Sequence, residues 1–165
     1  MNRRDIVIGF IILAVVAGIV YFVRRPKTTP IETPIATPSF EEQLENKFNT
    51  QIPDNLDKAE LKDITRQGGS GLATRNYENG IFNLTVLADL PDLEPNDFYE
   101  VWLSRGTAGQ NNYSLISIGS LQIAKGGFLL DFNENKNYSD YQNVIISLET
   151  KLNTSPEKII LEGSF

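Results

Sequence analysis

The chain has 165 residues, with no Cys and no His, and a net charge of −6. It therefore cannot form a disulfide, and it lacks the commonest transition-metal ligand and the bases of Ser-His-Asp and Cys-His nucleophile systems. Residues 1–27 carry a net charge of +4, which leaves −10 on residues 28–165. Because such a surface repels phosphate groups, we expect no nucleic-acid partner.

A short flank, residues 1–5, precedes an apolar run of 18 uncharged residues, 6–23. A helix of that length spans about 27 Å, close to the thickness of the hydrocarbon core of a bilayer. A cleaved signal peptide is the alternative, because Ala14 and Ala17 have the small-x-small spacing of a cleavage site. The apolar run continues to Val23, so the sequence favours an uncleaved, single-pass transmembrane helix.

Residues 24–38 form a linker rich in Pro and Thr, with Pro at positions 26, 30, 34 and 38. Proline at this spacing blocks a helix and favours an extended stalk. Basic residues flank the apolar run on both sides, so the positive-inside rule sets the topology only weakly.

The next segment, residues 39–66, is predicted to be helical and amphipathic. Ser39 and Glu42 have the spacing of a capping box, which marks the start of a helix that should end before Pro53. A second helical turn is expected around residues 56–64. Three apolar residues recur at helical spacing: Phe40, Leu44 and Phe48. This stripe packs either on the following domain or on a partner helix.

Residues 68–71, Gly-Gly-Ser-Gly, predict a flexible break, and residues 72–165 then alternate short β-prone runs with turn residues. Asn79-Gly80 predicts a tight hairpin, and Lys125-Gly126-Gly127 predicts a second one. No crossover helix follows any strand. The fold class expected is mainly β, an antiparallel sandwich of about seven strands.

Several motifs of this region occur in the order found in one known family. Residues 99–103 have the pattern Tyr-x-x-Trp-Leu, and glycines and an acidic residue follow at matching places. The residues that carry the resemblance are Tyr99, Trp102, Leu103, Gly119, Gly127, Glu149 and Gly163. Residues 72–165 thereby resemble the C-terminal domain of anti-sigma-K factors. The resemblance implies an immunoglobulin-like sandwich outside the cytoplasm, behind a single helix in the plasma membrane.

The chain departs from that family at its N-terminus. Anti-sigma factors of this kind hold their sigma factor with a cytoplasmic N-terminal domain, whereas only residues 1–5 precede the apolar run here. We therefore expect the sigma-binding domain to be absent. The resemblance then bears on fold and location more than on anti-sigma activity.

No residue type or spacing points to catalysis, so we predict that the protein is not an enzyme. Trp102 alternates with apolar neighbours and is expected in the core rather than at a ligand. Acidic residues around one predicted turn could hold Ca²⁺, although they lack the spacing of an EF-hand: Asp89, Asp92, Glu94 and Asp97. Our expectation is no metal, no cofactor and no catalytic residue.

These observations predict a membrane-anchored β module with an interaction or sensory role and a protein or envelope-polymer partner. Two alternatives stay open. One is a regulatory component of an anti-sigma system that acts with a separate cytoplasmic partner. The other is an envelope module that binds carbohydrate or calcium.

Overall fold

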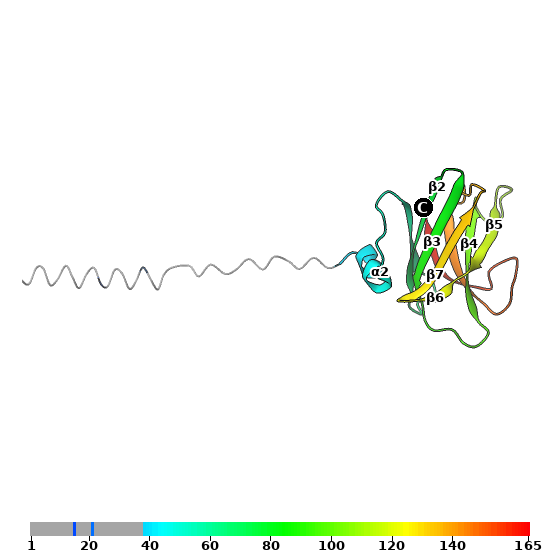
Figure 1. The fold of residues 1–165 in the computed structure, drawn as a ribbon. Coiled ribbons are helices and arrows are strands. Elements are labelled where there is room, and N and C mark those ends of the chain that lie inside the picture. The colour runs from blue at the N-terminus through cyan, green and yellow to red at the C-terminus, as the bar shows by residue number, and fades with distance from the viewer. Residues whose placement is uncertain (1–14, 16–20, 22–37) are drawn as a thin grey trace, which may run out of the picture. The chain divides into compact units, whose positions relative to one another are not determined.

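The computed structural model describes residues 15, 21 and 38–165, and residues 38–165 form one compact unit (Figure 1). Within the described residues, no helix has the length and apolar character needed to cross a membrane. The predicted transmembrane segment, residues 6–23, and the linker, residues 24–38, lie almost entirely outside these residues. Both therefore remain predictions.

The compact unit begins with helix α2, Phe40–Phe48. The predicted capping box is present: the Glu42 N–H donates to Ser39 Oγ at 3.2 Å, and the Ser39 N–H donates to Glu42 Oε2 at 2.7 Å. Asn49 closes the helix in the left-handed conformation, with φ of 53°. The helix thus ends before Pro53, as the sequence predicted.

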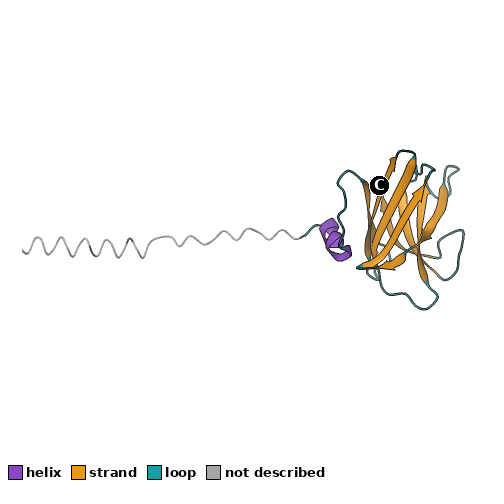
Figure 2. Cartoon of the chain, viewed as in Figure 1, coloured by secondary structure: helices purple, strands orange, loops and turns teal. Residues whose placement is uncertain are grey.

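Nine strands follow, and every paired neighbour is antiparallel. They are β1 (Asp57–Asp63), β2 (Ser70–Glu78), β3 (Ile81–Asp89), β4 (Phe98–Arg105), β5 (Ser114–Ser120), β6 (Gln122–Ala124), β7 (Gly127–Glu134), β8 (Asn143–Glu149) and β9 (Lys158–Ser164). They form one sheet in the order β5-β4-β8-β9-β1-β2-β3-β7-β6. Leu121 alone separates the two end strands, β5 and β6, in sequence. The sheet therefore curls until it nearly closes (Figure 2).

The mainly β, antiparallel fold class is confirmed, but the strands number nine rather than about seven. The predicted helical turn at residues 56–64 is wrong, because residues 57–63 form β1, which pairs with β2 and β9. The helical segment therefore ends at Phe48, not at residue 66, and the β region begins before residue 72. Lys and Glu favour helix locally, but burial of Ala59 and Leu61 on one side of the strand outweighs that preference.

Both predicted hairpins are present. Asn79 and Gly80, with φ of 54° and 81°, join β2 to β3 in the backbone conformation of a type I′ turn. Lys125 and Gly126 join β6 to β7. The first strand of this second hairpin has only three residues, because the chain passes from β5 to β6 at Leu121.

The main core fills the inside of the curled sheet. Large side chains from alternate positions of most strands are fully buried there, among them Phe82, Leu84, Val101, Leu103 and Ile146. A second, smaller apolar cluster lies on the outside, between α2 and the sheet. The apolar stripe of α2 thus packs on the β domain, one of the two outcomes expected for it.

Candidate functional site

The outer face of β2, β3 and β7 presents its side chains in rows that the register of the strands aligns. Leu72 of β2, Leu87 of β3 and Leu129 of β7 are direct neighbours in the first row. Leu44 of α2 and Ile52 pack on this row and complete the outer cluster. The helix is therefore held to the sheet by apolar burial, at about 25 cal/mol per Å² of surface removed from water.

The next row is polar and consists of Thr74, Thr85 and Asp131, again direct neighbours across the three strands. Thr85 Oγ1 donates to Asp131 Oδ1 at 2.7 Å. This row and Leu87 line a cavity of about 480 Å³, which the segment from α2 to β1 walls on another side. The apolar side chains of that wall are Phe48, Ile52, Pro53 and Leu56.

The cavity combines apolar walls with a few converging polar groups, the usual composition of a small-molecule site. Lys125, in the turn between β6 and β7, adds a positive charge to the lining, and Asp131 adds a negative one. The cavity could thus bind a small amphipathic molecule.

Two glycines let the turn between β6 and β7 approach α2 closely. A Cβ on Gly126 would lie 2.3 Å from the backbone oxygen of Lys47, and one on Gly127 would lie 2.5 Å from that of Ala88. Both glycines have positive φ, 97° and 150°. A side chain at position 126 would push the turn away from the end of α2, and one at position 127 would push it away from β3.

The residues chosen by resemblance do not form one site. Tyr99 and Leu103 point into the main core, where Tyr99 meets the Phe128 ring edge to face at 5.1 Å and donates to the Pro91 oxygen at 3.2 Å. Burial, reinforced by the negative charges of nearby Asp92 and Asp97, raises the pKa of Tyr99 above its ordinary value. Tyr99 is therefore a neutral packing residue.

Trp102 and Glu149 lie on the outer face of β4 and β8. Trp102 is buried, as predicted, although on the side opposite the main core, and its Nε1–H donates to Ser147 Oγ at 2.7 Å. Glu149 is also buried, and its Oε1 accepts from the Glu157 N–H at 2.9 Å. These two residues share a face with Glu100, which the sequence analysis did not single out.

Two of the glycines that carry the family resemblance, Gly119 and Gly163, allow strands to pack closely. A Cβ on Gly163 would lie 2.4 Å from the backbone oxygen of Glu60, so only glycine lets β9 pass β1 there. Gly119 has a φ of 144° at the irregularity between β4 and β5, and its nearest neighbour would be the Leu130 side chain at 3.6 Å. Both positions shape the sheet, and Gly163 also lines a shallow groove along β8 and β9.

The acidic turn before β4 does not assemble a metal site. Within residues 38–165, no group of three or more acidic side chains lies close enough to hold a metal ion. Asp92, Glu94 and Asp97 instead line a small hollow of about 170 Å³ beside Tyr99. Asp89 pairs with Lys47 at the end of α2.

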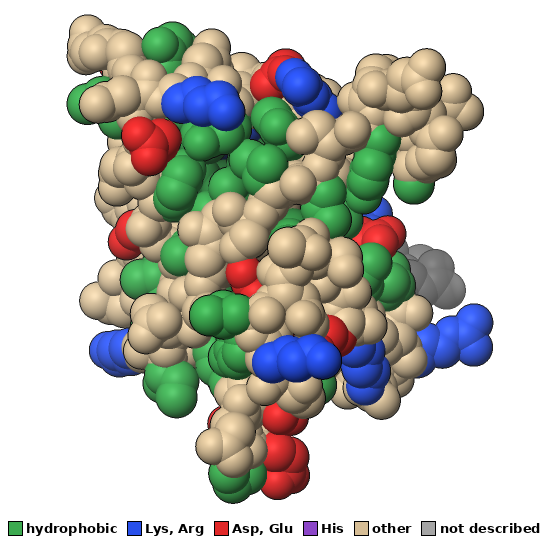
Figure 3. All heavy atoms as spheres, turned by 90° about the vertical axis from the view of Figure 1, so that its right-hand side faces the viewer, with side chains coloured by type: hydrophobic (Ala, Val, Ile, Leu, Met, Phe, Trp, Pro, Cys, Tyr) green, Lys and Arg blue, Asp and Glu red, His purple; other side chains and the backbone are tan. Residues whose placement is uncertain are grey.

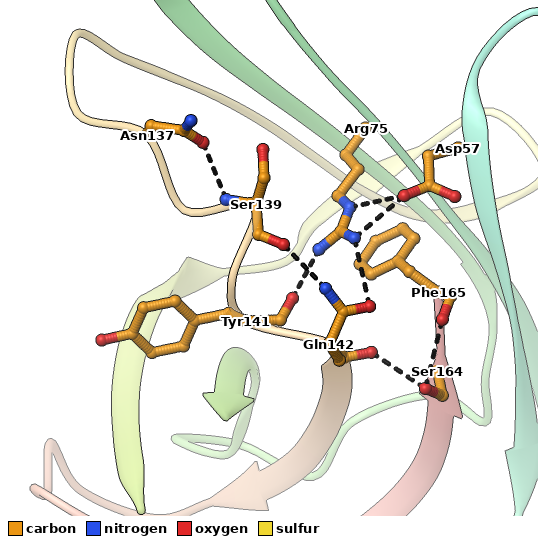
Figure 4. A network of polar contacts seen from close by, with 8 residues as sticks. All are labelled: Asp57, Arg75, Asn137, Ser139, Tyr141, Gln142, Ser164 and Phe165. Carbon is orange, nitrogen blue, oxygen red and sulfur yellow. Dashed lines mark hydrogen bonds and ion pairs between the residues drawn. The ribbon is translucent and has the colours of Figure 1, made fainter. Parts of the chain in front are cut away.

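A buried arginine organises one end of the sheet (Figure 4). Arg75 of β2 donates to Asp57 Oδ2 at 2.9 Å and to the Tyr141 oxygen at 2.5 Å, and its guanidinium stacks on the Phe165 ring at 3.9 Å. The Gln142 backbone oxygen accepts from the Phe165 N–H at 2.9 Å and from Ser164 Oγ at 3.0 Å. Since these groups satisfy Arg75, the network is structural and fastens the end of β9.

Hydrophobic side chains also gather on the side of the molecule where β5 lies, and charged side chains lie mainly around the edge of that face (Figure 3). A shallow groove of about 630 Å³ is lined by residues of β8 and β9 and of the loop that follows β4. Its lining includes Ala108, Tyr113, Ile145 and Ile159.

Comparison with models of known protein families finds no match, and neither a curated protein nor a solved structure shows significant similarity to the chain. The cavity beside α2 is the candidate site because it joins apolar walls to a row of aligned polar side chains. The sequence analysis missed its polar row, because Thr74, Thr85 and Asp131 are brought together only by strand register. The one signal available was the apolar pair Leu72 and Leu87 at outward positions of β2 and β3.

Proposed function

We propose that this protein is a non-catalytic sensory module, held outside the cytoplasm by residues 6–23 and carried on the stalk of residues 24–38. Its ligand would occupy the cavity beside α2. The proposal includes the immunoglobulin-like relationship implied by the motifs at residues 99–163. The absence of His and Cys from the chain supports a binding role over nucleophilic catalysis.

The proposal rests on where the segment that walls the cavity lies in the sequence. The segment that walls it follows α2 directly, and α2 follows the stalk. A ligand that contacts Phe48 and Ile52 would favour the docked position of α2, because binding stabilises the state to which it binds. Occupancy of the cavity would thus be transmitted to the segment that leads to the membrane.

Display outside the cytoplasm is tested by adding protease to intact and to permeabilised cells that express the full chain. We expect digestion of residues 38–165 in intact cells or after permeabilisation of an outer layer alone. Digestion only in inverted membrane vesicles would place the β domain in the cytoplasm and contradict the proposal.

The cavity is tested with a library of small amphipathic compounds, scored by the melting temperature of the full chain in detergent. Thr85→Tyr places a ring in the cavity, while Thr85→Val removes the hydroxyl group at nearly constant volume. We expect a compound that stabilises the natural chain to stabilise the Val variant as well and to lose its effect on the Tyr variant. Equal stabilisation of both variants would place the ligand elsewhere.

The second candidate is a regulatory component of an anti-sigma system, supported by the motifs shared with that family. It requires a cytoplasmic partner that contacts the transmembrane helix. Crosslinking in intact cells, followed by purification of the full chain, would capture a sigma factor or an anti-sigma protein if this candidate is right. Recovery of neither would leave the sensory module as the better explanation.

A further inference from the structure

Glu100 of β4 and Glu149 of β8 are buried in an unusual way. Only 3% of Glu100 and 0% of Glu149 is exposed, and each has one carboxylate oxygen, Oε2, that is buried without a hydrogen-bond partner. Neither forms an ion pair with a Lys or Arg of residues 38–165. Because a buried, unpaired charge is very costly, something must compensate these two carboxylates.

The register of β4 and β8 places the two side chains next to each other. Glu100 is directly opposite Ser147, and Glu149 is two residues further along β8. Ser147 Oγ accepts from Trp102 Nε1, so the side chains of all four residues share one face of the sheet. Diagonal neighbours of this kind have Cα atoms about 7–8 Å apart, within reach of two glutamates.

The other oxygen of each carboxylate, Oε1, accepts a hydrogen bond, and the two donors lie on opposite sides of the paired strands β4 and β8. Glu100 Oε1 accepts from Ser117 of β5, on one side of β4. Glu149 Oε1 accepts from the N–H of Glu157, in the connection to β9 on the other side of β8. The two oxygens of a carboxylate diverge, so this arrangement leaves the free oxygens for the space between β4 and β8.

We propose that Glu100 Oε2 and Glu149 Oε2 face each other and bind a divalent cation of the calcium type. Two carboxylates balance a charge of +2, and Ca²⁺ prefers oxygen ligands in flexible arrangements. Ser147 Oγ accepts a hydrogen bond from Trp102 Nε1, and its second lone pair can contact the ion. This site is separate from the acidic turn before β4 and goes beyond the function proposed above.

The only tryptophan of the chain reports on this site, because Trp102 is bonded to Ser147. The full chain, purified in detergent and stripped with a chelator, is titrated with CaCl₂ while tryptophan emission and melting temperature are recorded. Modules outside cells bind Ca²⁺ with dissociation constants of about 0.1–1 mM. At about 10 mM CaCl₂ we expect a rise of roughly 10 °C in melting temperature and a change in emission.

Glu100→Gln and Glu149→Gln keep the side-chain shape but remove the charge, and both should lose the calcium response. Asp97→Asn, in the acidic turn, and Thr85→Tyr, in the α2 cavity, are matched controls that should keep it. Failure of the cavity test alone would thus leave the calcium site standing. Using both glutamine variants guards against one that does not fold, and the titration of the natural chain needs no variant.

Two results would overturn the proposal. One is a natural chain whose melting temperature and emission do not respond to CaCl₂. The other is a response that survives both glutamine substitutions or disappears with Asp97→Asn.

Discussion

The outer faces of β2–β3–β7 and of β4–β8 both bury side chains, but with different chemistry. On the first, Leu72 and Leu87 are covered by Leu44 of α2. On the second, Trp102 is buried together with polar residues: Glu100, Ser104, Ser147 and Glu149. The first face needs only apolar area, whereas the second needs every polar atom to find a partner.

This difference shows how each face should respond to substitution. An apolar interface loses free energy in proportion to the surface uncovered and the cavity left behind. A buried polar face responds according to which partner is removed, because the remaining partner then bears the cost of desolvation. Substitutions on the two faces therefore test whether one is stabilised by apolar burial and the other by hydrogen bonds between buried polar groups.

The largest effect is expected for Trp102→Ala. The indole is 1% exposed, so its removal leaves a large cavity and should lower the free energy of unfolding by about 3–5 kcal/mol. Urea unfolding followed by circular dichroism measures the change, since the variant has no tryptophan. Trp102→Phe should recover most of the loss. A change in unfolding free energy below about 1 kcal/mol would show that the indole is not packed as described.

Leu44→Ala should have the next largest effect, because Leu44 is the buried residue of α2. We expect a loss of about 2–4 kcal/mol in unfolding free energy, with faster hydrogen exchange confined to α2 and its surroundings. Asn46→Ala, at an exposed position of the same helix, is the matched control and should change little. Equal effects of the two substitutions would mean that α2 does not depend on its contact with the sheet.

Ser147→Ala should cost about 1–2 kcal/mol in unfolding free energy, since it leaves the buried Trp102 Nε1–H without an acceptor. Adding Trp102→Phe to this variant removes the orphaned donor. The double variant should therefore be more stable than the sum of the two single losses predicts. Strict additivity would indicate that the hydrogen bond contributes nothing to the stability of this face.

Much of the fold could be predicted from local sequence. The capping box at Ser39 and the turns at Asn79-Gly80 and Lys125-Gly126 depend on short patterns, and the structure has them where they were predicted. Strand β1 was mistaken for helix because its exposed positions carry Lys and Glu. The alternation of Ala59 and Leu61 was the correct signal, but it is short, and pairing with β2 and β9 decides the outcome.

Short sequence patterns could not predict the candidate sites, because the residues of each site are far apart in the sequence. Thr74, Thr85 and Asp131 come from three strands, and only their register makes them neighbours. Glu100 and Glu149 are 49 positions apart in the sequence and meet through the pairing of β4 with β8. The alternation of side chains along a strand puts both glutamates on the outward face, and outward positions are normally exposed, so their burial could not be foreseen.

The smallest effect is expected at the loop that borders the polar face. The Thr150 N–H and hydroxyl group and the Asn153 amide donate hydrogen bonds to the Glu157 carboxylate, and they lower its pKa below the ordinary value of 4.5. A lowered pKa in the folded state stabilises the fold above pH 4.5, and this contribution is lost as the pH falls through the folded-state pKa. Acid should therefore loosen the loop that carries the Glu157 N–H to Glu149.

Asp63 also has a lowered pKa, so it too lowers the free energy of unfolding in acid. Glu157→Gln is therefore needed to isolate the contribution of Glu157. Urea unfolding is measured at neutral pH and well below pH 4.5. The free energy of unfolding should fall less between the two pH values in the variant than in the natural chain. Asp63→Asn provides the parallel comparison at a loop far from β8 in sequence. If the acid response of the natural chain equals that of Glu157→Gln, the loop does not depend on this carboxylate. The burial of Glu149 would then rest on the sheet alone.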